Sequence, residues 1–203
     1  MQNSTKIPAR RGRPRQFDRD QALSAAMQLF WEKGFAAVSL DELAGAMNMN
    51  RPSLYNAFGN KEAVYRQALQ LFVAQISSRL EEALFSGHDL KVSLQRFYAA
   101  ALDIYLSGER SLGCFVTCTS PAEALLFPAI QEELQDVIVQ VDAVLERRLR
   151  LAQSAGQWPA ERSAGAAAVV LHSLLQSLAL RVRAGEERAT LEAMVGMVLD
   201  TLC

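Results

Sequence analysis

Long apolar runs, secretion signals and paired cysteines are all missing from this sequence, and each absence excludes a class of protein. No stretch approaches the roughly 18 uninterrupted apolar residues of a membrane-spanning helix. The N-terminus is basic, and no apolar segment follows it as in a secretion signal. The three cysteines, at positions 114, 118 and 203, are too few and too unevenly placed for a disulfide framework. We therefore expect a soluble, cytoplasmic protein with no membrane partner.

The sequence also lacks the motifs of common catalytic and cofactor sites. His, Cys, Asp and Glu do not recur at metal-ligand spacing, and no glycine-rich loop follows a strand to hold a nucleotide. We expect neither a metal nor a cofactor. A hydrolase that used Cys114 or Cys118 with His172 would need a thiol–imidazole pair and an oxyanion hole, which sequence spacing does not indicate. A binding protein is the better interpretation than an enzyme.

Helical periodicity runs through the chain instead. Half of its 203 residues are apolar, enough for a sizeable core, and they recur at helical spacings. The pattern Ser120 to Glu123 predicts a capping box with Pro121 at the first helical position, and Pro128 divides this helix from a long one. Besides that short helix, longer helices are predicted over residues 18–33, 60–86, 90–106, 128–155, 160–184 and 188–202. With no strand of any length, the predicted fold class is all-α.

Two short helices between residues 39 and 58 predict a helix-turn-helix. Ser39 and Glu42 form a capping box at the start of the first helix, where each side chain can accept a backbone N–H that lacks a helical partner. Asn50 can cap the second helix, because Pro52 in a first turn loses no hydrogen bond. Apolar residues line one face of the first helix: Leu40, Leu43, Ala44 and Met47. A tight turn joins the two helices.

The basic residues are concentrated in the part of the chain that carries this motif. Residues 1–66 hold ten Lys or Arg and six Asp or Glu, whereas residues 67–203 hold eleven and sixteen. Lys and Arg drive binding to phosphates by releasing condensed counterions. Within the acid-free first 17 residues, Arg11-Gly12-Arg13-Pro14 resembles the core of an AT-hook, an extended arm whose arginines enter a narrow minor groove, and Arg11, Arg13 and Arg15 are candidate DNA contacts. The N-terminal part is thus expected to approach DNA.

Residues 17–65 resemble the TetR family of transcriptional regulators. The resemblance rests on the runs AMQLFWEKGF, SLDELA and SLYNAFGNKEAVY. It implies an N-terminal three-helix helix-turn-helix head joined by a long helix to a C-terminal helical ligand-binding and dimerisation body. The domains expected from it are a flexible basic arm over residues 1–15, a DNA-binding domain over residues 16–76 and a ligand-sensing and dimerisation domain over residues 77–203. The implied partners are double-stranded DNA with a palindromic operator, a second copy of the chain, and an unknown small-molecule or electrophile effector that releases a repressor.

The resemblance also assigns side chains to DNA. Hydroxyls of Ser39 and Tyr55 would meet phosphates, and Lys61 would add a positive charge near the N-terminus of the long helix. The residues that would face base edges in the major groove are Arg51, Pro52, Ser53 and Asn56. Each of these side chains has the alternative interpretation of an ordinary solvated residue.

Ligand-contacting residues in the body are less well defined by sequence. Aromatic residues that could line an apolar cavity, or belong to the core, are Phe97, Tyr98, Tyr105, Phe115, Phe127 and Trp158. His172 could orient a ligand or be a hydrogen-bonded core histidine. Cys114 and Cys118 could react with oxidants or electrophiles as thiolates, or be structural.

The last two predicted helices carry apolar stripes wide enough to pack on their own body and on a partner. The stripes comprise Leu171, Leu174, Leu175 and Leu178 in one helix, and Leu191, Met194, Val195, Val198, Leu199 and Leu202 in the other. A homodimer is therefore predicted. The remaining functional alternative is a non-sensing architectural or constitutive DNA-binding dimer, which would leave the large apolar body without a role.

Overall fold

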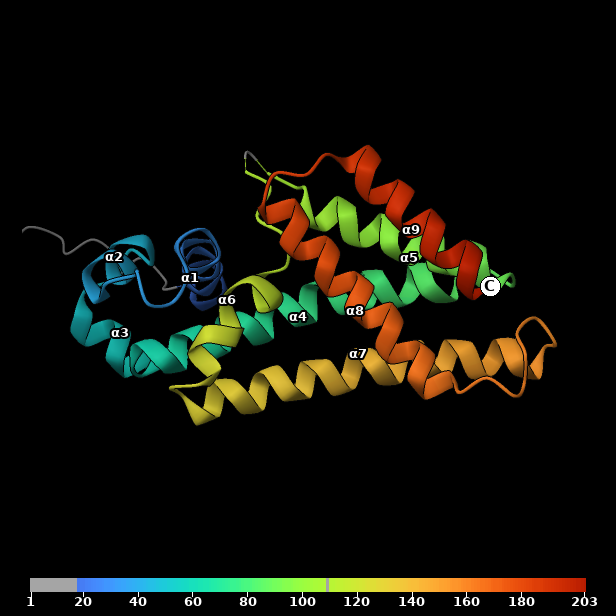
Figure 1. Ribbon diagram of the computed structural model, residues 1–203. Helices are drawn as coiled ribbons and strands as arrows, with labels where there is room; N and C mark the ends of the chain where they lie inside the picture. The colour runs from blue at the N-terminus through green and yellow to red at the C-terminus, as the bar shows by residue number, and fades with distance from the viewer. Residues whose placement is uncertain (1–17, 109) are drawn as a thin grey trace, which may run out of the picture.

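The computed structural model describes residues 18–108 and 110–203, and the regular elements within these ranges are all helices. Three short helices form a head at one end of the molecule: α1 (Arg19–Lys33), α2 (Leu40–Ala46) and α3 (Arg51–Phe58) (Figure 1). The body comprises α4 (Lys61–Phe85), which leads out of the head, α5 (Leu90–Tyr105), α6 (Phe115–Ala124), α7 (Pro128–Ser154), α8 (Ala164–Arg183) and α9 (Arg188–Leu202). The all-α prediction is confirmed. The arm with Arg11, Arg13 and Arg15 lies outside the described residues.

Side-chain caps fix the start of each helix in and beside the head. The carboxylate of Asp18 accepts two backbone N–H groups at the start of α1, and Ser39 and Glu42 form both halves of the predicted capping box on α2. The side chains of Asn50 and Asn60 cap α3 and α4 in the same way. Each cap satisfies an N–H group that a first helical turn leaves unpaired. These boundaries therefore depend on local sequence, and they were predicted correctly.

The turn between α2 and α3 is built on a left-handed asparagine. Asn48 has φ of 53°, a conformation that asparagine tolerates better than most residues. The N–H of Met49 donates to Ala44 O at 2.9 Å, and that of Asn48 donates to Gly45 O at 3.0 Å. This pair of bonds closes a helix C-terminus as a Schellman motif. The motif fixes the angle at which α3 leaves α2.

The head is joined to the body by a continuous apolar core and by buried hydrogen bonds. Phe30 and Tyr65 pack with their ring centroids 5.2 Å apart, and both belong to the same buried cluster as the body helices. The guanidinium of Arg183, at the end of α8, donates to the carbonyls of Trp31 and Leu112 at 3.1 Å each. The expected domain boundary at residue 76 falls inside α4, which is continuous from residue 61 to residue 85.

Helix α6 begins six residues earlier than predicted. It starts at Phe115, so Ser120 and Pro121 lie inside the helix and the predicted capping box is wrong. Phe115 and Val116 are buried in the core, and the hydroxyl of Ser120 is 3.1 Å from that of Tyr65 instead of capping its own helix. Tertiary packing has overridden the local signal.

The long helix α7 begins at Pro128 as predicted, but α8 begins at Ala164, four residues later than predicted. The amide of Gln153 donates to the carbonyls of Pro159 and Arg162, at 3.0 and 2.9 Å, and holds this segment as a turn. Ser163 then caps α8. Among the described residues α8 alone is long and apolar enough to cross a membrane, but 44% of its most apolar 18-residue window is buried within the protein.

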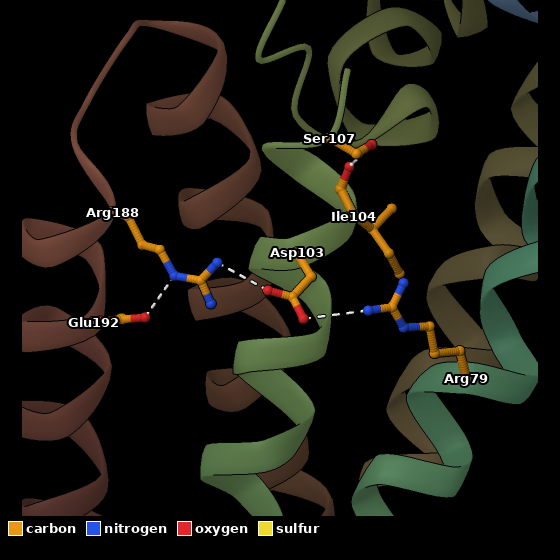
Figure 2. Close-up of polar contacts among 6 residues, drawn as sticks. All are labelled: Arg79, Asp103, Ile104, Ser107, Arg188 and Glu192. Carbon is orange, nitrogen blue, oxygen red and sulfur yellow. Dashed lines mark hydrogen bonds and ion pairs between the residues drawn. The ribbon is translucent and has the colours of Figure 1, made fainter. Parts of the chain in front are cut away.

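An ion-pair network orients the C-terminal helix on the body. Figure 2 shows Asp103 of α5 between two arginines. Its carboxylate accepts a hydrogen bond from Arg79 of α4 at 3.2 Å and another from Arg188 of α9 at 2.8 Å. Arg188 also donates a hydrogen bond to Glu192 at 2.7 Å. Exposed pairs of this kind contribute little to stability individually. Their effect here is to align α4, α5 and α9.

Candidate nucleic-acid interface and ligand cavity

The outer face of α3 carries the polar residues that the sequence assigned to DNA. Leu54 and Phe58 are 1% and 5% exposed and anchor the helix to the head. The residues on the opposite side of the helix are exposed: Pro52, Ser53, Tyr55 and Asn56. A rigid helix with one buried and one polar face can be inserted into the major groove without unfolding the head.

Ser53 and Asn56 also border a groove of about 850 Å³ beside α3. The groove is also lined by Asp18, which caps α1, by Gln21 of α1 and by Met47 at the end of α2. These two polar residues therefore lie at the edge between α3 and α1. Whether they contact DNA stays a prediction.

Arg51 is held by a carboxylate that sequence analysis did not single out. Its Nε donates to Asp41 Oδ1 at 2.6 Å and its Nη2 to Asp41 Oδ2 at 2.5 Å. These hydrogen bonds lower the pKa of the Asp41 carboxyl and raise that of the guanidinium. Both side chains are more than half exposed. The pair links the two helices, since Asp41 is in the first turn of α2 and Arg51 begins α3.

Ser39 and Lys61, assigned to phosphates by the resemblance, already have partners within the protein. The hydroxyl of Ser39 donates to Glu42 Oε2 at 2.8 Å, so phosphate would have to compete with the capping box. The ammonium of Lys61 lies 4.4 Å from the ring centre of Phe35 and 3.5 Å from Ala36 O. Partial burial lowers its pKa.

A cavity of about 390 Å³ lies between α4, α5, α6, α7 and α8. Its wall is mainly apolar, with Val73, Ile76 and Leu80 from α4, Val116 from α6, Val137, Val141 and Val144 from α7, and Leu175 from α8. Four of the predicted pocket residues line it: Phe97, Tyr105, Cys114 and His172. This size and composition suit a small, largely apolar molecule.

The other four predicted pocket residues do not line this cavity, because packing or hydrogen bonding holds them elsewhere. Tyr98 donates its hydroxyl to Leu171 O at 2.7 Å, and Cys118 places its sulfur 3.7 Å from Ala179 O. Phe115 packs edge-on against Tyr65, and Phe127 against Phe35 in the head. Trp158 is also outside the cavity, since its indole N–H donates to Leu202 O at 3.0 Å.

The cavity contains a small number of polar groups. His172 Nδ1 is 2.7 Å from Asp142 Oδ1, and its Nε2 is 3.4 Å from the amide nitrogen of Gln176. The Cys114 side chain is buried, and burial raises the pKa of its thiol although hydrogen bonds from Thr117 and from the Tyr105 hydroxyl favour the thiolate. The thiol of Cys118 has a raised pKa for the same main reason. The sequence left open whether Cys114 and Cys118 are reactive thiolates. Burial favours the neutral thiol form of both.

Sequence analysis missed the amides in the cavity wall. Gln140 lies on the face of α7 that also carries Val137, Val141 and Val144, and a polar residue within an apolar stripe was the signal that could have identified it. Gln176 follows His172 by one turn on α8. In the described part of the chain, no three His, Cys, Asp or Glu side chains cluster in a way that could hold a metal ion.

Comparisons with known proteins agree with this arrangement. Residues 22–68 match the model of the bacterial regulatory proteins of the tetR family. The repressor ComR of Escherichia coli K12 is 31% identical over 197 residues, which are 95% of this chain and 90% of that protein. The repressor BdcR of the same strain is 36% identical over 105 residues, about half of either protein.

Solved structures show the same fold. A cysteine variant of the TetR family regulator CifR, in complex with a 26-base-pair operator, has 28% sequence identity and a TM-score of 0.84. The likeness covers 93% of this chain and 98% of that one, and so extends through both head and body. With a full-length relative above 30% identity and a matching family model over the head, the chain belongs to the tetR family of bacterial regulatory proteins.

Proposed function

We propose that this DNA-binding transcriptional regulator is a repressor that binds a palindromic operator as a homodimer and leaves it when a small molecule fills the cavity. The observation that carries the proposal is the position of α6. Cys114, Val116 and Thr117 at its start line the cavity, and Thr119 and Ser120 one turn later meet Tyr65 of the helix that leaves the head. The repressor names of ComR and BdcR and the operator complex of CifR support the DNA-binding part of the proposal.

The surface of α8 and α9 supports the dimer. The leucines 171, 174, 175 and 178 are buried within the protomer, so they are not free for a partner. Large apolar residues remain exposed on the other face of the two helices: Val169, Val170 and Leu180 on α8 and Met197 on α9, between 53% and 72% exposed. Val170 and Met197 border the same groove between α8 and α9, and large exposed apolar residues of this kind are typical of a protein interface. A two-helix face from each protomer forms a four-helix bundle.

Two-fold symmetry predicts the form of the operator. Two α3 helices related by the dimer axis enter major grooves on one side of the duplex. Half-sites should therefore be inverted repeats whose centres are separated by about one helical turn, roughly 34 Å, or a small multiple of it.

The cavity wall supports a neutral effector with a large apolar part. Glu81 is the only Asp, Glu, Lys or Arg among the described residues that line it, and Glu81 is ion-paired with Arg147, so a bound anion would lack a compensating charge in the wall. His172 and Gln176 offer hydrogen bonds at one side, and burial keeps the Cys114 thiol in the wall mainly neutral, so an electrophile would react with it slowly.

Selection of duplexes from a random pool, followed by footprinting, tests the DNA-binding part. We expect one palindrome to be protected at low protein concentration. Arg51→Ala should change base preference at one symmetric position, whereas Lys61→Ala should weaken all sequences alike and reduce the salt dependence. Uniform protection of any duplex would favour the architectural alternative.

A thermal-shift screen, with fluorescence anisotropy of the selected duplex, tests the effector part. Matched probes of similar shape are 4-ethylphenol, 4-ethylanisole, 4-ethylbenzoate and an α,β-unsaturated aldehyde. A ligand of the folded protein raises the free energy of unfolding by RT ln(1 + [L]/Kd), and the melting temperature rises as a result. We expect the neutral probes to bind and the benzoate to fail.

An effect of the aldehyde that is lost in Cys114→Ala but kept in Cys118→Ala would assign the reacting thiol. If no compound or oxidant shifts the melting temperature or releases DNA, a constitutive DNA-binding dimer is the better description.

A further inference from the structure

We propose that Asp41 is a positioning residue for base recognition, whose carboxylate holds the guanidinium of Arg51 so that the remaining edge of that guanidinium meets guanine. The inference rests on the proposed function, in which α3 enters the major groove. It assigns to base recognition a residue of α2 that is negatively charged, as DNA is.

The hydrogen-bond geometry leaves one edge of the guanidinium unoccupied by Asp41. A guanidinium has five N–H donors in a rigid planar fork. Asp41 takes the edge formed by Nε and Nη2, with distances of 2.6 and 2.5 Å. The two N–H groups of Nη1 and the second N–H of Nη2 point away from the carboxylate. Nη1 and Nη2 thus still present two nearly parallel donors, the arrangement that O6 and N7 of guanine accept.

The backbone at both ends of the contact is fixed. Asp41 is the second residue of α2 and lies between Ser39 and Glu42, the two residues of the capping box. Arg51 is the first residue of α3, between the Asn50 cap and Pro52. A long arginine side chain loses rotamer freedom when it binds, and a partner that orders it beforehand reduces that loss. Two rigid anchors and a bidentate contact leave the guanidinium little freedom.

Charge considerations favour positioning over stabilisation as the role of Asp41. Arg51 lies at the positive end of the α3 dipole, where a cation is disfavoured, and the neighbouring carboxylate offsets this. The side chains of Arg51 and Asp41 are 54% and 74% exposed, and such a pair contributes little to folding. Next to DNA the carboxylate repels phosphates, which weakens binding to every sequence. Ordering of Arg51 compensates for this repulsion only where a guanine accepts the free edge.

The test compares the wild-type dimer, Asp41→Asn, Arg51→Ala and the double variant. Duplexes are selected from a random pool by the wild type, and affinity is then measured for the selected duplex and its single-position variants. Asp20→Asn is the matched control, because it removes an exposed acid of the head from α1 without touching Arg51. Arg51→Lys is a second probe, because lysine keeps the charge but cannot present two parallel donors.

We expect the wild type to prefer guanine at one symmetric position by roughly 5- to 150-fold, the range for a bidentate arginine. Asp41→Asn should reduce that preference at least threefold while binding to unrelated duplexes stays equal or tightens. Arg51→Lys should lose most of the preference. In the Arg51→Ala background, Asp41→Asn should have no further effect on it. Asp20→Asn should leave the preference unchanged, and all melting temperatures should stay close to the wild-type value.

Three results would contradict the inference in distinguishable ways. If Asp41→Asn leaves the guanine preference unchanged while Arg51→Ala removes it, Asp41 has no positioning role and the proposed function stands. If Asp41→Asn increases both affinity and preference, the carboxylate competes with DNA for Arg51 instead of orienting it. If Arg51→Ala has no effect on base preference, the assignment of Arg51 as a reading residue is wrong, and the inference falls with it.

Discussion

The hydroxyl of Tyr65 lies 2.6 Å from the hydroxyl of Thr119, so the helix that leaves the head is hydrogen-bonded to the helix that borders the cavity. Tyr65 is completely buried, and burial raises the pKa of its phenol. Thr119 in turn donates to Phe115 O at 2.7 Å. A ligand that displaces the start of α6 must therefore also disturb the base of the head.

Tyr65→Phe should lower the free energy of unfolding by about 1–2 kcal/mol, because the buried hydroxyls of Thr119 and Ser120 lose a partner. It should also reduce the loss of DNA affinity that an effector causes. Urea denaturation and anisotropy measure the two effects. Tyr55→Phe is the matched control, since Tyr55 is 46% exposed; its removal should weaken DNA binding and leave stability unchanged. Equal stability of Tyr65→Phe and wild type would contradict the role of this contact.

Val141→Phe should fill part of the cavity and abolish the thermal shift caused by a cavity ligand. The cavity of about 390 Å³ has room for the larger ring, so stability should be unchanged or higher. DNA binding without ligand should persist. Val139→Phe is the control on the same helix, because Val139 is 58% exposed and should leave the ligand response intact. Ligand binding that survives in Val141→Phe would place the ligand elsewhere.

Val170→Glu should convert the homodimer to monomers by placing a charge in an apolar interface. Sedimentation at micromolar concentration gives the mass of the particle directly. Operator affinity should fall as the mass falls to that of a monomer, because a monomer contacts only one half-site. Leu125→Glu changes a residue that is 88% exposed at the end of α6 and should leave the dimer intact. A dimeric Val170→Glu protein would exclude this face of α8 as the interface.

Glu42 should make the head sensitive to acid. Its hydrogen bond with Lys33, together with those from Ser39, lowers the pKa of Glu42 from 4.5 to about 2. Because the folded-state pKa is the lower one, this stabilisation is complete above pH 4.5 and is lost as the pH falls toward 2. Glu42→Gln should therefore flatten the dependence of unfolding free energy on pH below 4.5. Urea denaturation at a series of pH values measures this slope, and an unaltered slope would show that other carboxyls determine it.

The boundaries of most helices were predictable because they depend on residues within one turn. Asp18, Asn50 and Asn60 cap the helices that follow them, as their chemistry predicts. The same reasoning failed at Ser120, since a residue of α4, Tyr65, takes up its hydroxyl. It failed again before Ala164, where Gln153 of the preceding helix holds the turn. In both cases the deciding partner lies outside the helical turn that starts the helix, 55 residues away for Ser120 and nine residues from Arg162 for Gln153.

The candidate sites were predictable to different extents for the same reason. The exposed face of α3 follows from the amphipathic pattern of a single helix. The contact of Arg51 with Asp41 depends on the angle set by Asn48, which composition does not specify. In the body, the pattern indicates that Phe97 and Tyr98 are both buried, but only the placement of five helices shows that Phe97 faces a void and Tyr98 does not.

Pro121 is the position at which α6 bends most easily. Proline has no N–H, so the carbonyl of Thr117, four residues earlier, receives no helical hydrogen bond from residue 121. The part of α6 that touches both the cavity and Tyr65 precedes Pro121, and the part that leads to α7 follows it. Bending at Pro121 breaks one backbone bond fewer than bending elsewhere in the helix. The part of α6 before Pro121 can therefore tilt, while bending at Pro121 leaves α7 in place.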